Sequence, residues 1–380
     1  MIFFLLIYIV FLGYLSYRRY RILFNPFILT LQIPLLFLVV PQIIFILVMD
    51  GEDSFLSDTV IFAFVTANYI GCLIKVPFIK IPNFKNIALI KTSLYIIGAA
   101  CAIPLIPMLL SYGISFRGLR QFYEEVVFSQ YSSFYAILKI ILTCLIILNF
   151  IRIRKINKEI FILSIILLFS GSKMAMLSTF IVFAALWEQY KKINYKKLTY
   201  IALIMAIGMI GYHSAQNTND KVDAMKGALS YFDVYNQQSK ALTMLVDGDI
   251  DYYYGELYFS SFYKIIPRFL WQDKPKDFGF ALLNYKIYPE YSADGYMPSF
   301  GLAYTFADFG FFSIIFMGIL GGLFKNLWYK EFLHNHKNIP SFIIYILDLD
   351  IVTYFIITIG YLLSYLKNDS QNNSPLLAKR

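Results

Sequence analysis

Long apolar segments recur along this chain of 380 residues, and short polar connections separate them. A helix needs about 20 mostly apolar residues to cross a bilayer, where a helix satisfies its own backbone hydrogen bonds. Ten segments approach or exceed this length, so we expect an all-α polytopic membrane protein with about ten transmembrane helices. The segments are Ile2–Tyr17, Phe27–Val48, Asp58–Ile74, Ile87–Leu110, Phe134–Ile151, Glu159–Ser170, Lys173–Gln189, Leu198–Tyr212, Gly301–Leu327 and Phe342–Leu363.

The composition fits a protein that lies mostly in lipid. Hydrophobic residues make up 59% of the chain and charged residues 15%, and the mean hydropathy is +0.62. A soluble globular protein carries roughly 25% charged residues. This difference argues against a soluble enzyme, a disordered chain, a secreted disulfide scaffold and a nucleic-acid-binding protein. The three cysteines lie within apolar segments, so neither a disulfide framework nor a zinc site is expected.

The charges of the connections predict which side of the membrane each one faces. Five connections are rich in Lys and Arg, and they alternate along the chain with acidic or polar connections. Because short basic loops stay in the cytoplasm, both ends of the chain are expected outside it. The first seventeen residues lack a cleavage site, so we expect a retained helix. Asp348 and Asp350 interrupt the last segment, either as functional acids or as a break in the helix.

Two outer connections are long enough to fold. We expect eight transmembrane helices over residues 1–212 with an interfacial segment at 111–133, a large extracytoplasmic loop over 213–298, two helices over 299–366 and a polar tail over 367–380. The loop of 86 residues holds eighteen aromatic residues, eleven of them Tyr. It is too aromatic for a disordered chain, so we expect a partly helical cap. Its rings form either the cap's core and an aromatic belt or a surface on which sugars stack.

Several cationic side chains are candidates for binding phosphate on the outer side. Arg268 carries a planar guanidinium group, whose donors match phosphate oxygens, and the phosphates just outside a membrane belong to lipids. Lys173 follows a glycine and opens a helix, where backbone N–H groups favour an anion. Arg117 and Arg120 lie among aromatic residues in the interfacial segment. Each residue also has a competing explanation. Arg268 would form a salt bridge within the loop, Lys173 would extend to the membrane surface, and Arg117 and Arg120 would anchor lipid headgroups.

Signals for other chemistry are weak. His213, the only histidine on the expected outer side, suits either a general base or a helix cap. The DGDID sequence that begins at Asp247 fails the EF-hand pattern, because Tyr252 and Tyr258 stand where that pattern needs Gly and Glu. The chain has no Walker loop, dinucleotide fingerprint, HExxH or Gly-x-Ser-x-Gly sequence. Hydrolysis of a soluble nucleotide is therefore not expected.

Three motifs resemble those of bacterial oligosaccharide repeat-unit polymerases, the Wzy-type O-antigen and capsular polysaccharide polymerases. They are IPRFLWQDKP around Arg268, GYMPSFGLAYTFADFGFF about twenty residues later, and SGSKMAML at the hairpin between the sixth and seventh segments. The last is similar to a Ser-Gly-Ser-Arg-Gly turn of the superfamily that includes the O-antigen ligases, with Lys173 in place of Arg. Arg268 and Gly279 also have the Arg-x10-Gly spacing of some members. The resemblance covers roughly residues 161–323.

The resemblance implies a GT-C-like fold and a glycosyltransferase at the outer face of the bacterial cytoplasmic membrane, without metal or cofactor. A hydroxyl group of an incoming repeat unit attacks the reducing-end sugar of a glycan linked to undecaprenyl pyrophosphate, which leaves. Cationic side chains would hold the pyrophosphate, and a base would accept the acceptor's proton. The implied catalytic residues are Arg268 and one of His213, Glu256 and Asp294, and the implied substrate-binding residues are Lys173, Arg117, Arg120, Lys274, Gly279 and Trp271.

Other roles stay open. An O-antigen ligase of the same superfamily would transfer the finished glycan to a lipid core and would want a histidine in the outer loop. A flippase for lipid-linked oligosaccharides would show internal repeats and broken helices in matching halves, and the sequence lacks this symmetry. A purely structural membrane protein would not need a cationic, aromatic outer cap. The expected partners are lipid-linked repeat units, membrane lipids, a chain-length regulator and a flippase, and no nucleic acid.

Overall fold

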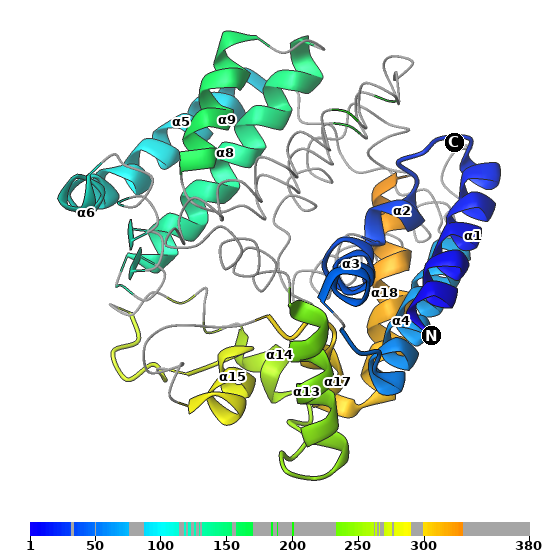
Figure 1. Cartoon of the computed structure of the whole chain (residues 1–380). Coiled ribbons are helices and arrows are strands. Elements are labelled where there is room, and N and C mark those ends of the chain that lie inside the picture. The colour runs from blue at the N-terminus through cyan, green and yellow to red at the C-terminus, as the bar shows by residue number, and fades with distance from the viewer. Residues whose placement is uncertain are drawn as a thin grey trace, which may run out of the picture. The chain divides into compact units, whose positions relative to one another are not determined.

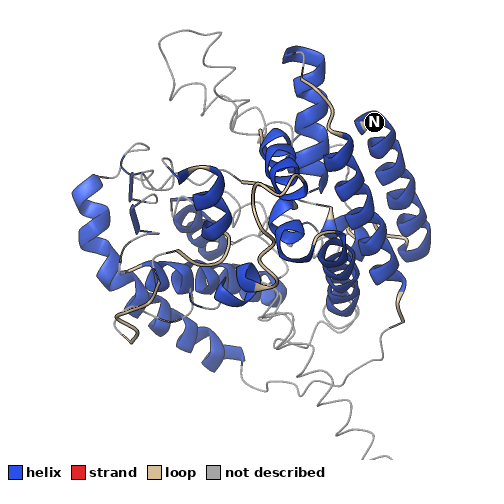
Figure 2. Ribbon diagram, turned by 90° about the horizontal axis from the view of Figure 1, so that it is seen from below, coloured by secondary structure: helices blue, strands red, loops and turns tan. Residues whose placement is uncertain are grey.

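The computed structural model describes residues 1–31, 34–49, 51–75, 87–113, 118, 121–122, 125–126, 129, 131–153, 157–169, 184, 188, 200, 233–261, 263, 266, 270–275, 277–289 and 299–329. These residues form helices and turns and no strand (Figure 1, Figure 2). The expected all-α class is therefore confirmed for the described part of the chain. Lipid favours this class, because each helix satisfies its backbone hydrogen bonds within one segment.

Four of the described helices are long and apolar enough to cross a membrane. They are Ile2–Tyr20, Phe55–Leu73, Lys91–Tyr112 and Ser132–Phe150, and the shorter apolar helices are Pro34–Leu47 and Phe311–Asn326. All six lie within or close to expected segments. The expected segments over 173–189, 198–212 and 342–363 lie outside the described residues, apart from three isolated positions. The total of ten spans therefore stays a prediction.

Two compact units organise the described residues. The first combines residues of Met1–Ile74, Ala184–Leu257 and Phe280–Asn326, and the second those of Lys75–Phe183, Tyr258–Gly279 and Leu327–Arg380. The first unit contains α1 (Ile2–Tyr20), α2 (Pro26–Thr30), η1 (Pro34–Val39), α3 (Val40–Met49), α4 (Phe55–Leu73), α13 (Val234–Val246), α15 (Ala281–Ile287), α17 (Ala303–Phe309) and most of α18 (Phe311–Trp328). The second contains α5 (Ile87–Ala102), η2 (Ile103–Leu105), α6 (Ile106–Tyr112), α8 (Ser132–Ile153) and α9 (Lys158–Phe169), and α14 (Glu256–Ser260) crosses the boundary. The expected outer loop thus contributes to both units.

Proline and glycine interrupt two of the expected spans. The segment expected over 27–48 comprises α2, η1 and α3, and Pro34 opens η1. Proline has no N–H group to continue a helical ladder, so a new element begins there. The segment expected over 301–327 is divided into α17 and α18 at Gly310, whose φ of 60° ends α17. Apolar composition alone shows neither break.

Glycines bring α4 and α18 into close contact, and Figure 1 shows the two helices side by side. A methyl group on Gly318 would lie 2.6 Å from Ala67 Cβ, and one on Gly71 or Gly322 would overlap the backbone of the opposite helix. The pairs Ala67-x3-Gly71 and Gly318-x3-Gly322 therefore form a small-residue interface. Such spacing lets membrane helices approach closely enough for their backbones to touch.

Helix α13, which belongs to the expected outer loop, packs against the first turn of α4. Tyr235 of α13 is buried, and its hydroxyl accepts a hydrogen bond from the Ser54 N–H at 2.9 Å and donates one to Asp58 Oδ1 at 2.8 Å. Burial raises the pKa of Tyr235, so its phenol stays protonated and donates. Asp58 is fully buried in α4. A buried hydrogen bond therefore joins α13 to the apolar helix α4 within the first unit.

In the second unit, α5, α8 and α9 lie side by side (Figure 1). Lys91 Nζ of α5 lies 2.6 Å from Glu159 Oε1 in the first turn of α9. The Tyr95 hydroxyl, one turn further along α5, donates to the same carboxylate. Ionisable side chains in membrane helices usually pair in this way, because an unpaired charge beside lipid is costly. The pair fixes the starts of α5 and α9 relative to each other.

Candidate functional site

Four of the ten sequence-predicted site residues lie in the described part of the chain, and they are Glu256, Trp271, Lys274 and Gly279. The other six, Arg117, Arg120, Lys173, His213, Arg268 and Asp294, lie outside the described residues. Three of the four share one stretch of the second unit, between α14 and position 279. The IPRFLWQDKP motif is thus described at its first residue and over its last six.

Lys274 is buried, with 8% of its surface exposed. Its Nζ donates a hydrogen bond to the Ile266 carbonyl at 3.0 Å and lies 4.7 Å from the centre of the Phe278 ring. Its backbone N–H donates to the Trp271 carbonyl at 3.2 Å. Lys274 thus fixes Ile266, which precedes the motif arginine by two positions in the sequence. A carbonyl and an aromatic ring already surround the ammonium group, which favours a positioning role over direct contact with phosphate.

Aromatic rings pack around this stretch. Trp271 meets Tyr263 edge-on, with ring centres 4.9 Å apart and planes at 82°. Tyr263 also lies 6.1 Å from the Phe278 ring. Such edge-to-face pairs add specific packing energy to the burial of the rings. Trp271 itself remains partly exposed, as a ring that stacks on a sugar must be.

Gly279 ends the stretch in a conformation that other residues avoid. Its φ is 58°, in the left-handed region. Its N–H donates to Ser260 Oγ at 2.7 Å, and a Cβ at this position would lie 2.6 Å from Ser261 Oγ. The structure therefore explains the glycine of the Arg-x10-Gly spacing, because only glycine allows the chain to pack this closely against the end of α14.

We expect Gly279→Ala to lower the unfolding midpoint of the purified protein. The alanine would occupy a left-handed conformation, which costs about 1–2 kcal/mol, and its methyl group would displace Ser261. Gly248→Ala is the matched control, because Gly248 also has a positive φ, 82°, but an added Cβ there meets no atom within 4 Å. Thermal unfolding in one detergent compares the two variants. Equal losses would show that the contact with Ser261 does not matter.

Glu256, one of the candidate bases, is exposed at the first position of α14. Gly255 and Leu257 are the chain neighbours of Glu256. Their backbone N–H groups donate hydrogen bonds to Oδ1 of the buried Asp308 in α17, at 3.0 Å and 3.2 Å respectively. Tyr254 and Gly255 both have positive φ values, 50° and 97°. Helix α17 thus holds a tight turn that presents Glu256 to solvent, where a carboxylate can accept a proton.

Asp308 is not among the sequence-predicted site residues, although it organises this turn. It is fully buried near the end of α17. The signal was present, because an acidic residue stands within the apolar FADFGFF sequence, and ionisable residues in such runs usually have a role. The same reasoning identified Asp348 and Asp350, which lie outside the described residues. The role of Asp308 depends on a turn far away in the sequence, which spacing does not reveal.

Asp308→Ala should destabilise the protein by roughly 1–3 kcal/mol, because the N–H groups of Gly255 and Leu257 lose their acceptor inside the protein. Asp308→Asn keeps an oxygen at the same place and should therefore lose less. Thermal unfolding of the two purified variants in one detergent makes the comparison. If both variants unfold at the same temperature, below that of the wild type, then the negative charge of Asp308 stabilises the protein and an oxygen acceptor alone does not.

Phe300 and Gly301 of the Pro-Ser-Phe-Gly motif precede α17 and serve packing. Gly301 has a φ of 54°, and a Cβ there would lie 2.7 Å from Gln238 Oε1. That same oxygen accepts the Leu302 N–H at 2.8 Å, and Gln238 is buried in α13. Phe300 is fully buried and stacks on Tyr288 with planes 11° apart. This motif therefore anchors α17 to α13 within the first unit.

Tyr253, a half-buried residue of the expected outer loop, stays neutral. Burial, followed by the charges of Glu256 and Asp308, raises the pKa of Tyr253 to about 12. The Tyr253 hydroxyl donates to the Leu282 carbonyl at 3.2 Å. At neutral pH this phenol can donate a hydrogen bond, but it cannot act as a general base.

The described part of the chain contains no group of three or more His, Cys, Asp or Glu side chains that could hold a metal ion. In the second unit it offers a stretch with contacts of Lys274 and Gly279 and partly exposed aromatic rings, and in the first unit, separately, an exposed carboxylate at Glu256. These groups suit the positioning of an anion-binding arginine, the stacking of sugars and the acceptance of a proton.

The apolar helices define this chain as a multi-pass helical membrane protein. It is similar to two curated proteins, the O-antigen polymerases of Salmonella typhimurium and Salmonella typhi, with 28% identity over 184 residues in each case. The match includes 47% of this chain and 43% of each relative, so it spans less than half the length of these relatives. No protein family profile and no solved structure matches the chain. The resemblance to Wzy-type O-antigen polymerases is therefore confirmed.

Proposed function

We propose that this protein polymerises lipid-linked oligosaccharide repeat units into O-antigen or capsular polysaccharide at the outer face of the bacterial cytoplasmic membrane. The similarity to two O-antigen polymerases carries this proposal. The apolar helices support a membrane location, and the alternation of basic connections supports action on the outer side. The donor is a growing glycan on undecaprenyl pyrophosphate, and the acceptor is a second lipid-linked repeat unit.

The reaction exchanges one bond at the anomeric carbon for another. A hydroxyl oxygen of the acceptor forms a new glycosidic bond to the reducing-end sugar of the donor, and the bond from that carbon to the diphosphate oxygen breaks. Undecaprenyl pyrophosphate leaves with the electron pair. The acceptor proton passes to a base, for which Glu256, His213 and Asp294 are the candidates. Glu256 is the one that lies in the described part of the chain, where it is exposed on a rigid turn.

Cationic side chains would lower the barrier, because negative charge builds on the leaving pyrophosphate in the transition state. Donors that are held in place before the reaction stabilise this charge without further rearrangement. We assign this role to Arg268, Lys173 and one of Arg117 and Arg120. Fixed charges of this kind can replace a metal ion as the stabilising group.

The packing around the IPRFLWQDKP motif supports this assignment. Lys274 holds the Ile266 carbonyl, and Gly279 holds the end of the stretch against Ser260. These contacts join described residues that precede Arg268 in the sequence, Ser260 and Ile266, to residues that follow it, Lys274 and Gly279. Catalysis benefits when a charged group needs no reorganisation. We therefore assign positioning roles to Lys274 and Gly279, and a sugar-stacking role to the partly exposed Trp271.

Deletion of the protein, followed by gel analysis of the surface glycan, tests the proposed function. A strain that makes only single-repeat product would support a polymerase. Free polymer that stays on its carrier lipid would instead identify an O-antigen ligase. Repeat units that stay inside the membrane would identify a flippase, and an unchanged glycan would exclude all three activities.

A further inference from the structure

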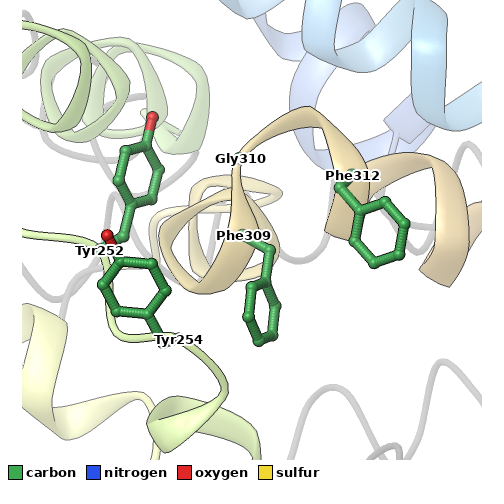
Figure 3. Close-up of a pocket in the computed structure, with 5 residues that line it drawn as sticks. All are labelled: Tyr252, Tyr254, Phe309, Gly310 and Phe312. Atoms are coloured by element: carbon green, nitrogen blue, oxygen red, sulfur yellow. The ribbon is translucent and has the colours of Figure 1, made fainter.

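Five residues line an open pocket of about 320 Å³ in the first unit, and we call it the aromatic pocket (Figure 3). They are Tyr252, Tyr254, Phe309, Gly310 and Phe312. Figure 3 shows Phe309 between Tyr254 and Phe312, and the ring centres lie 6.2 Å apart in the first pair and 6.5 Å apart in the second. The volume lies at the lower end of the range typical of small-molecule sites.

The break between α17 and α18 creates this pocket. Gly310 adopts a φ of 60°, which ends α17 and turns the chain into α18. Gly310 lines the pocket without a side chain, and an added Cβ there would come into van der Waals contact with the Tyr252 ring at 3.7 Å. Tyr254 also has a positive φ, 50°, in the turn that α17 holds. Fixed backbone turns therefore carry the aromatic rings on both sides.

The aromatic pocket continues onto the exposed face of an apolar helix. Phe312 is 71% exposed, and its ring stacks on that of Phe316 with centres 6.1 Å apart and planes at 8°. Ile315 is also exposed beside them, and α18 is apolar over residues 311–326. An exposed apolar face on such a helix belongs to lipid. The row from Phe309 through Phe312 to Phe316 thus leads from the pocket into the expected bilayer.

The lining of the pocket selects an apolar ligand. The polar side-chain atoms among the five described lining residues are the hydroxyl groups of Tyr252 and Tyr254, and none of these five residues is cationic. A sugar would need several hydrogen-bond partners, and a diphosphate would need cations. A ligand that reaches the pocket along Phe312 and Phe316 must also come from the lipid side.

We propose that the aromatic pocket binds the isoprene units next to the diphosphate of the lipid-linked substrate, an inference that rests on the proposed function. A polyisoprenyl chain is apolar, carries a methyl branch on each unit and is stiffened by double bonds. It therefore loses less conformational entropy on binding to rigid rings than a freely rotating acyl chain does. The hydroxyl groups of Tyr252 and Tyr254 stand where the chain meets its polar head. Bound in this way, the lipid presents its diphosphate at the level of the outer loop.

Photolabelling of the full-length protein in nanodiscs tests this site, with a benzophenone-bearing farnesyl diphosphate as the probe. Mass spectrometry should find the label on the peptides that contain Tyr254 or Phe312. Phe312→Ala and Tyr254→Ala should each reduce labelling roughly ten-fold, since each removes one wall of aromatic contact. Phe4→Ala is the matched control, because Phe4 is 64% exposed on the apolar helix α1 and does not line the pocket.

Competition identifies the source of the ligand. Undecaprenyl phosphate should displace the probe, and phosphatidylglycerol at the same concentration should not. Equal displacement by phosphatidylglycerol would reduce the pocket to a part of the general lipid surface, and unchanged labelling of both pocket variants would also overturn the proposal. The thermal midpoint of each variant confirms its fold. If the deletion strain keeps its polymer, the proposed function fails, whereas the labelling pattern independently decides whether the pocket binds a polyisoprenyl chain.

Discussion

Arg268→Ala should abolish long glycan chains, and Arg268→Lys should leave part of the activity. In the proposed reaction the guanidinium group holds the pyrophosphate while negative charge develops on it. Loss of one preplaced donor typically lowers the rate by ~10²–10³. Lysine keeps the positive charge but offers no planar pair of donors, so it should restore a fraction of the rate. The order of activity is therefore expected to be arginine, lysine and then alanine.

Two measurements check this order. A deletion strain that expresses each variant shows the chain length of the surface glycan on a gel, and the purified protein shows the rate at which it joins lipid-linked repeat units. Arg18→Ala is a suitable control, because Arg18 is exposed at the end of α1 on the expected cytoplasmic side. Immunoblots establish that all variants reach the membrane in equal amounts. Wild-type chain lengths with Arg268→Ala would refute the role of Arg268.

The neighbourhood of Arg268 shows what sequence reasoning can and cannot find in such a site. A motif with Arg268, Trp271 and Lys274 predicts a polar, aromatic stretch that faces phosphate and sugar. It does not predict that Lys274 is buried with its ammonium group on the Ile266 carbonyl, because a lysine in a polar motif looks the same whether it binds a ligand or the backbone. The spacing of Gly279 likewise gives no indication that Ser260 and Ser261 are its partners.

For the fold as well, the sequence predicts the features that depend on a single segment, but not those that depend on contacts between distant segments. Hydropathy places the membrane helices, since lipid acts on each apolar segment separately. The end of α17 at Gly310 and the cap that Asp308 supplies to a turn some fifty residues earlier depend on tertiary contacts. The small-residue spacing from Gly318 to Gly322 is visible in the sequence, but several apolar helices could have been its partner. Only the structure identifies α4 as that partner.

Gly322→Ala is expected to force α4 and α18 apart and to lower the stability of the protein severely. A methyl group on Gly322 would overlap the Asn68 carbonyl and lie 2.9 Å from the Cys72 nitrogen. Both are backbone atoms of a helix, so they cannot rotate away as a side chain could. Overpacking of a close interface costs about 1–3 kcal/mol, and the weaker packing along the separated helices adds to this cost. Thermal unfolding in detergent measures the loss of stability.

The neighbouring glycine offers a control that adds the same methyl group one position away. A Cβ on Gly321 meets the Asn68 side-chain oxygen at 3.1 Å, and among the described residues outside α18 it meets no backbone atom within 4 Å. Alanine is also a better helix former than glycine by roughly 1 kcal/mol. Gly321→Ala should therefore be close to neutral, although it lies on the same turn of α18. A similar loss in both variants would mean that any added volume on this helix is harmful.

A buried cysteine can report the separation of the two helices directly. Cys72 is buried in α4, and its thiol lies 3.5 Å from the Gly322 carbonyl. Because the chain has three cysteines, Cys101→Ser and Cys144→Ser leave Cys72 as the single thiol. In this background a thiol-reactive dye should label the Gly322→Ala variant much faster than the Gly321→Ala variant, since only the first opens the interface. Equal and slow labelling of the two variants would show that the packing of α4 on α18 does not depend on direct backbone contact. In that case the close approach of the two helices would result from the rest of the fold and would not itself stabilise it.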